Sequence, residues 1–137
     1  MTVLERVNAR SFDPDLLPWA PDLIVIDVSF ISLAKVLPAV LAGAADRFDC
    51  LAMVKPQFEV GRDRVARGGV VRDAAAREEA LVAVARSGEA LGAAVCGFAS
   101  SGLPGPAGNL ETFAWLAESG REGALEDVEA AAAEARP

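Results

Sequence analysis

Three continuous apolar runs, separated by stretches of helical periodicity, constrain the fold of this chain more than any other feature. The runs are DLIVID (22–27), CLAMV (50–54) and AAVCGFA (93–99). Strands that are covered on both faces have this composition. Between the runs, residues 32–48 and 74–91 carry apolar side chains at spacings of three and four, which predicts two helices, the first kinked or restarted at Pro38. The alternation predicts an α/β layered fold with a mostly parallel sheet.

The other segments predict one domain over residues 1–118 and a separate tail. TVLER (2–6) is short and β-branched and predicts a strand, whereas residues 56–73 have no clean period and predict a long loop. A loop of that length in a compact domain is usually functional. NLETFAWL (109–116) fits either a helix or a strand, and its spacing slightly favours the helix. Residues 119–137 are rich in alanine and acidic residues, which predicts a tail that is either a frayed helix or disordered.

Composition excludes several kinds of chemistry. The formal net charge of −7 argues against nucleic-acid binding through bulk charge, although the loop at 56–73 holds a local group of arginines. The chain has no histidine, so histidine-based triads and the usual zinc sites are excluded, and no cysteine spacing predicts a metal site. No stretch approaches 18 apolar residues, and the charges in MTVLERVNAR do not suit a signal peptide. We therefore expect a soluble, cytoplasmic protein that does not act on membranes.

Two ionisable side chains stand at the ends of consecutive apolar runs. Asp27 ends the first run, and Lys55 directly follows the second. Because the carboxyl ends of parallel strands meet at one edge of a sheet, where ligands gather, we expect the two side chains to lie close together. One interpretation is a salt bridge or simple solvation of the strand ends. The other is an active site in which Lys55 acts as a base, because burial favours the neutral form of a lysine.

Five motifs favour the active site. They are ERVNAR (5–10), DVSFISL (27–33), VKPQFEVG (54–61), GGVVRD (68–73) and GLPGPAGNLE (102–111). In this order they resemble the TlyA family, often labelled hemolysin A, within the FtsJ-like ribose methyltransferases, and the resemblance covers residues 2–117. Many relatives have GIVRDP followed by a histidine where this chain has Ala74 and Arg77. That departure touches no catalytic position of the family.

The resemblance implies an enzyme that uses S-adenosyl-L-methionine to methylate the 2′-hydroxyl of a cytidine ribose in ribosomal RNA. Such enzymes carry a Lys, Asp, Lys, Glu tetrad, whose last three members fall on Asp27, Lys55 and Glu111. Lys55 would be the base when neutral, or would stabilise the developing alkoxide when charged. Asp27 would orient the lysine and the hydroxyl, and Glu111 would fix the amine. Since the family's glutamate belongs to a strand, the resemblance also predicts a strand at NLETFAWL.

The resemblance further implies cofactor and RNA contacts, each with a plainer alternative. The cofactor pocket would include Asn8, Arg10, Asp27 and Ser29. The alternatives are a turn asparagine and a solvated arginine at 8 and 10, and a Ser29 and Phe30 that only cap and pack the next helix. Four arginines would lie against RNA phosphates, or would simply be solvated in their loop: Arg62, Arg64, Arg67 and Arg72.

Part of the family's pattern is not found in these 137 residues. Members have an RNA-binding domain, a segment with the first tetrad lysine, and a glycine-rich strand and helix that hold the methionine end of the cofactor. We therefore expect a partial Rossmann-like class I methyltransferase sheet, without its first two strands, that is inactive alone. The exposed DLIVID edge would be covered by TVLER, would pair in a homodimer, or would make the chain behave poorly in solution.

Two other functions remain as alternatives. One is a non-catalytic remnant, or partner-binding α/β module, that keeps the sheet without the cofactor site. The other, membrane lysis, follows only from the hemolysin label of the family. The sequence disfavours it because it contains no membrane span and no basic amphipathic helix.

Overall fold

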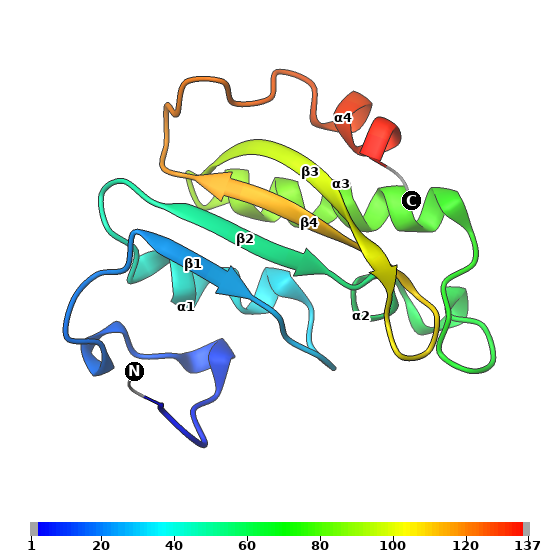
Figure 1. Cartoon of the computed structure of the whole chain (residues 1–137), viewed down its shortest axis with the longest axis horizontal. Helices are drawn as coiled ribbons and strands as arrows, with labels where there is room; N and C mark the ends of the chain where they lie inside the picture. The colour runs from blue at the N-terminus through cyan, green and yellow to red at the C-terminus, as the bar shows by residue number, and fades with distance from the viewer. Residues whose placement is uncertain (1–2, 136–137) are drawn as a thin grey trace.

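A computed structural model describes residues 3–135 and shows a four-stranded sheet with helices packed behind it (Figure 1). The strands are β1 (Leu23–Ile26), β2 (Asp49–Val54), β3 (Ala94–Pro104) and β4 (Leu110–Ala117), in the spatial order β1-β2-β4-β3. β1 and β2 pair in parallel, and β4 is antiparallel to both β2 and β3. Three of the four strands therefore run in one direction, which agrees with the predicted α/β fold. The ambiguous segment at 109–116 forms β4, as the resemblance predicted.

The helices differ in length from the sequence prediction. They are α1 (Leu37–Ala42), α2 (Pro56–Glu59), α3 (Ala74–Ala90) and α4 (Val128–Ala135). The predicted helix over 32–48 is a 3-10 turn at Leu33–Lys35 followed by α1, with Pro38 in the first turn of the new helix. Proline is tolerated there because that N–H has no partner within the helix. The long loop at 56–73 contains the single turn α2 and a 3-10 turn, Arg62–Arg64.

The core lies on one face of the sheet. Successive side chains of a strand point to opposite faces, and the even-numbered positions of β1, β2 and β4 pack against α1, α3 and the 3-10 turn between β1 and α1. Buried members from the strands are Ile24, Ile26, Cys50, Ala52, Val54, Ala114 and Leu116. On the other face, Leu23 and Val25 are 62% and 64% exposed. The prediction that these strands are covered on both faces is therefore wrong for β1 among residues 3–135.

The predicted strand at TVLER is also wrong for the residues that the structure describes, and Thr2 lies outside them. Val3 and Leu4 have no regular structure, and Glu5 and Arg6 form a turn in which Arg6 has φ = 60°. Further on, two 3-10 turns, Ala9–Ser11 and Pro14–Leu16, pack against α1. Within residues 3–135, the outer edge of β1 has no paired strand, so TVLER does not cover this edge.

The segment after β4 is packed onto the domain. The backbone N–H of Leu125 donates to the carbonyl of Val95 at 2.8 Å, and α4 packs against α3 and β3. Val128 and Ala132 of α4 are buried, and Arg86 of α3 donates to Glu129 at 2.5 Å. Where the sequence left a frayed helix or disorder open, residues 128–135 are a helix held by apolar and charged contacts.

Arg121 holds the start of this segment against β2. Its side chain, only 13% exposed, donates to Asp49 Oδ1 at 2.9 Å and to Glu118 Oε1 at 2.8 Å. Trp115 Nε1 donates to the same Asp49 oxygen at 2.9 Å. The hydrogen bonds from Arg121 lower the pKa of Glu118 to about 2. This network was not predictable from the sequence, because its members lie on three separate segments.

Candidate functional site

Strand register brings Asp27, Lys55 and Glu111 to one edge of the sheet. Asp27 follows β1 and Lys55 follows β2, which lie side by side in parallel with Ile26 opposite Ala52. The β2–β4 register places Val54 opposite Thr112, so one further step along it sets Lys55 opposite Glu111. Directly opposed residues of antiparallel strands have Cβ atoms about 5 Å apart. All three residues have odd numbers, like the strand positions whose side chains point away from the core.

Lys55 is the centre of the site. Its Nζ lies 2.5 Å from Asp27 Oδ1 and donates to Ser29 Oγ at 3.3 Å. The lysine side chain is 13% exposed, whereas that of Asp27 is 61% exposed. The ammonium is thus enclosed by protein on most sides, and the carboxylate that orients it faces outward. Lys55 and Asp27 therefore form the salt bridge of the first interpretation. A salt bridge at this position is also compatible with a catalytic role for Lys55.

Glu111 lines a cavity together with Lys55. The cavity has a volume of about 400 Å³, and its other lining residues include Ser29, Phe30, Gln57, Phe58 and Pro106. Glu111 is 8% exposed, and it makes no ion pair within residues 3–135. Gly105 allows this placement, because a Cβ at that position would lie 2.6 Å from Glu111 Oε1. The nearly buried Lys55 and the buried Glu111 therefore share the wall of one cavity.

Asn109 fastens the arginine-bearing loop to the turn that delivers Glu111. It is 1% exposed, and its Oδ1 accepts from the backbone N–H of Val71 at 2.9 Å. Its Nδ2 donates to the carbonyl of Gly69 at 2.8 Å. No role for Asn109 was predicted from the sequence, although this residue lies inside one of the five motifs.

Glu59 makes a similar link between the loop after β1 and α2. Its Oε2 accepts from Ser32 Oγ at 2.6 Å, and its Oε1 accepts from the backbone N–H of Leu33 at 2.8 Å. Burial raises the pKa of Glu59. No role for Glu59 was predicted from the sequence either, although this residue ends VKPQFE.

A groove with cations and aromatic rings adjoins the cavity. Phe30 has φ = 63°, is 91% exposed, and lies with its ring centroid 5.1 Å from that of Phe58. Both rings line the cavity and also the groove, which has a volume of about 830 Å³. The charged residues that line the groove are Arg10, Lys35 and Arg62. The groove is therefore positive and has aromatic walls.

The structure separates the other predicted site residues. Asn8 is exposed, and its side chain accepts from the backbone N–H of Arg10 at 3.0 Å. This contact is the one expected of a turn asparagine, the alternative to a cofactor contact. Arg64 is held by Asp73 and Glu79. Arg67 and Arg72 are exposed outside the groove lining. Of the four predicted RNA-binding arginines, only Arg62 lines the groove.

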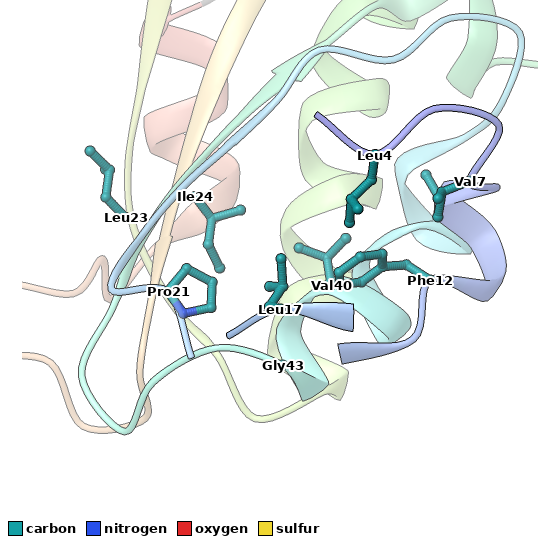
Figure 2. Close-up of a pocket in the computed structure, with 10 residues that line it drawn as sticks. Leu4, Val7, Phe12, Leu17, Pro21, Leu23, Ile24, Val40 and Gly43 are labelled. Atoms are coloured by element: carbon teal, nitrogen blue, oxygen red, sulfur yellow. The ribbon is translucent and has the colours of Figure 1, made fainter. Parts of the chain in front are cut away.

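A second cavity, of about 350 Å³, lies beside the beginning of β1 (Figure 2). Apolar side chains of the N-terminal segment, β1 and α1 line it, among them Leu4, Phe12, Ile24 and Val40. No charged or polar side chain is in its wall, so it offers no group for acid–base chemistry. Among residues 3–135 there is also no cluster of three side chains that could hold a metal ion.

Comparison with known proteins decides the family. The model of the FtsJ-like methyltransferase family matches residues 1–118. The chain belongs to this family. Its mixed α/β fold and its four-stranded sheet are those of an FtsJ-like domain, and the site at Lys55 lies within the matched residues.

Named relatives agree with this assignment. The 16S/23S rRNA (cytidine-2′-O)-methyltransferase TlyA of Mycobacterium tuberculosis is 49% identical over 116 residues, which are 85% of this chain and 43% of that protein. Hemolysin A of Brachyspira hyodysenteriae is 32% identical over 118 residues, or 81% of this chain and 47% of that protein. A solved structure from Lactococcus lactis that carries a hemolysin label has a TM-score of 0.86 and 31% identity, and covers 97% of this chain and 65% of its own.

The chain spans less than half the length of the curated relatives described above. Despite the hemolysin labels, none of the helices in residues 3–135 has the length and apolar character needed to cross a bilayer.

Proposed function

We propose that this chain carries the catalytic side chains of an S-adenosyl-L-methionine-dependent enzyme that methylates the ribose 2′-hydroxyl of a cytidine in ribosomal RNA. The observation that carries the proposal is the 2.5 Å contact of Lys55 Nζ with Asp27 Oδ1 beside the buried Glu111. These three residues match three of the four members of the family's tetrad. We include a cytoplasmic location in this proposal, because ribosomal RNA is the substrate named for the TlyA relative.

The three side chains suit the proton transfer that this reaction needs. A ribose hydroxyl is a weak nucleophile, and removal of its proton during attack makes it a better one. Lys55 accepts that proton as a neutral amine, or stabilises the oxygen as an ammonium. Asp27 fixes the direction of the Lys55 amine, and Glu111, in the wall of the same cavity, would accept a second hydrogen bond from the amine. The bound cofactor supplies an electrophilic methyl group on its sulfonium.

The residues that would hold the cofactor are fewer than the sequence predicted. Asp27 and Ser29 fit, because both contact Lys55 and the second carboxylate oxygen of Asp27 is not used in that contact. We propose that Asn8 is not among them, since its side-chain oxygen already accepts from Arg10 N–H and caps a 3-10 turn. Arg10 fits the RNA groove better than a cofactor pocket. We propose that this partial set is insufficient, and that the chain alone is inactive.

RNA would enter along the groove. Arg10, Lys35 and Arg62 supply positive charge for phosphates, and the exposed Phe30 ring offers a surface on which a base can stack. The cavity of about 400 Å³ then accepts the target ribose next to Lys55. In this arrangement the groove binds the RNA, and methyl transfer takes place in the cavity.

Methyl transfer from labelled S-adenosyl-L-methionine into ribosomal RNA tests the function. The chain alone should transfer nothing, and co-expression with the N-terminal portion of a TlyA-like relative should restore transfer. Lys55→Met should abolish the restored activity, with Lys35→Met as the matched lysine control that weakens RNA binding only. Full activity of Lys55→Met would refute the role of this residue. Tight cofactor binding by the chain alone in calorimetry would refute the proposal that its cofactor site is incomplete.

We also propose that the open edge of β1 pairs with a second polypeptide, the first candidate being a second copy. Leu23 and Val25 expose apolar side chains beside this edge. A symmetric antiparallel pairing that uses all four residues of β1 sets Asp22 opposite Asp27 of the other copy, and facing like charges weaken a strand pair. Dimerisation in sedimentation velocity should therefore strengthen in Asp22→Asn and disappear in Val25→Lys. A monodisperse monomer in both variants would exclude the homodimer.

A further inference from the structure

The loop between β1 and the Leu33–Lys35 turn carries most of the site without regular structure of its own. Residues 27–32 form neither helix nor strand, yet they place Ser29 and Phe30 in the wall of the cavity and Asp27 against Lys55. Phe30 is held at φ = 63°, a region that costs free energy for any residue with a side chain. Such a loop keeps one conformation only where its surroundings fix it.

Two connections hold this loop to the end of β2. The first is the site itself, where Lys55 binds Asp27 and Ser29. The second is Glu59, four residues after Lys55 at the other end of α2, which accepts from Ser32 Oγ at 2.6 Å and from Leu33 N–H at 2.8 Å. Bonds that accept on a carboxylate are about twice as strong as those between neutral groups. The far end of the loop is therefore fixed to the helix that begins at the catalytic lysine.

We propose that Glu59 is a positioning residue, which acts on Lys55 by holding the 27–32 loop against α2 so that Asp27 and Ser29 keep their contacts with the amine. Glu59 does not line the cavity and touches no reacting atom. Its partial burial supports the role, since the two donors Ser32 Oγ and Leu33 N–H satisfy a carboxylate that is partly removed from water. The consequence for catalysis rests on the proposed function, whereas the geometric effect on Lys55 does not.

The chain contains only two lysines, so the effect on Lys55 can be measured directly. The experiment is the rate of acylation of each lysine by a water-soluble N-hydroxysuccinimide ester, followed by mass spectrometry on the whole chain without RNA or cofactor. Lys35 is exposed and serves as the internal reference, whereas Lys55 is enclosed and paired. Glu59→Ala should raise the rate of Lys55 relative to Lys35 by about tenfold, which corresponds to the loss of one charge-assisted hydrogen bond.

Three further variants separate positioning from general destabilisation. Glu59→Gln should restore a rate near that of the unsubstituted chain, because its amide can accept from Leu33 N–H and donate to Ser32 Oγ. Val84→Ala, a core change in α3, should lower the melting temperature without changing the Lys55 rate. Ser32→Ala should raise the rate less than Glu59→Ala, and it decides the question if Glu59→Ala does not fold.

An unchanged relative rate in folded Glu59→Ala, or in Ser32→Ala if the former does not fold, would overturn the proposal. An equal increase in Val84→Ala would overturn it as well, since the effect would then be one of overall stability. Because the assay contains neither RNA nor cofactor, a failure of methyl transfer would count against the proposed function and leave this result intact.

Discussion

Replacing Asn109 by alanine tests whether one buried amide holds the arginine-bearing loop in place. The side chain makes two hydrogen bonds to that loop, from Val71 N–H and to the Gly69 carbonyl. Each contributes about 1 kcal/mol, and leaving the buried Val71 N–H unpaired costs about 1–3 kcal/mol more. The free energy of unfolding should therefore fall by about 3–5 kcal/mol, measured by urea denaturation.

Trypsin reports on the loop itself, because the loop contains four cleavage sites, after Arg62, Arg64, Arg67 and Arg72. If local opening becomes easier by about 2 kcal/mol, the open fraction rises about 30-fold, and cleavage in the loop should accelerate by a similar factor. Mass spectrometry of the first fragments locates the cut. Cleavage elsewhere in the chain should change less.

Asn8→Ala is the matched control. Asn8 is exposed and makes one local bond, to Arg10 N–H, far from the loop in sequence. Its loss should leave loop cleavage unchanged. If folded Asn109→Ala shows loop cleavage within about twofold of the unsubstituted chain, the reasoning is refuted, since the loop would then be held by other contacts.

Three other predictions follow from close contacts and burial. Gly105→Ala should displace the Glu111 carboxylate, since its Cβ would lie 2.6 Å from Oε1, and should lower the free energy of unfolding in urea by about 1–3 kcal/mol. Hydrogen bonds from Arg121 hold the folded-state pKa of Glu118 at about 2, below its ordinary 4.5. The stability that the ionised Glu118 contributes is therefore complete above pH 4.5 and is lost as the pH falls toward 2. Glu118→Gln should flatten the fall in melting temperature over that range. Burial raises the pKa of the Cys50 thiol to about 12 and that of Cys96 less strongly, so iodoacetamide at pH 8 should alkylate Cys50 more slowly until the chain unfolds.

The sequence predicts the sheet well where one pattern excludes the alternatives. The runs at DLIVID, CLAMV and AAVCGFA are short and apolar, and each forms most or all of a strand segment, although β1 is buried on one face only. NLETFAWL was ambiguous because its apolar residues satisfy periods of both 2 and 3.6, and only pairing with β2 and β3 on its two sides decides it. TVLER failed because a β-branched run forms a strand only where a neighbouring strand completes its hydrogen bonds.

The sequence predicts the proximity of Asp27 and Lys55, but not the side chains of Glu59 and Asn109 that hold the surrounding loops. Asp27 and Lys55 end consecutive strands, so their proximity follows from the parallel pairing alone. Glu59 and Asn109 act through partners 26 to 40 residues away, and no local pattern encodes such contacts. The ion pair of Arg64 with Glu79 was not predictable for the same reason, since Glu79 lies on α3. Charge in a sequence is visible, but its neutralisation by a distant segment is not.

Side chains alternate between the two faces of the sheet along each strand, so the position of a residue in the strand decides which face it joins. Odd positions of β2 and β4 lead to Lys55 and Glu111, and even positions build the core. Deleting one residue inside β2 would exchange the two sets, moving the lysine toward the core and core side chains into water. We therefore expect tolerated insertions and deletions to lie in the loops of this domain. Within these strands, only insertions or deletions of two residues would keep each side chain on its face.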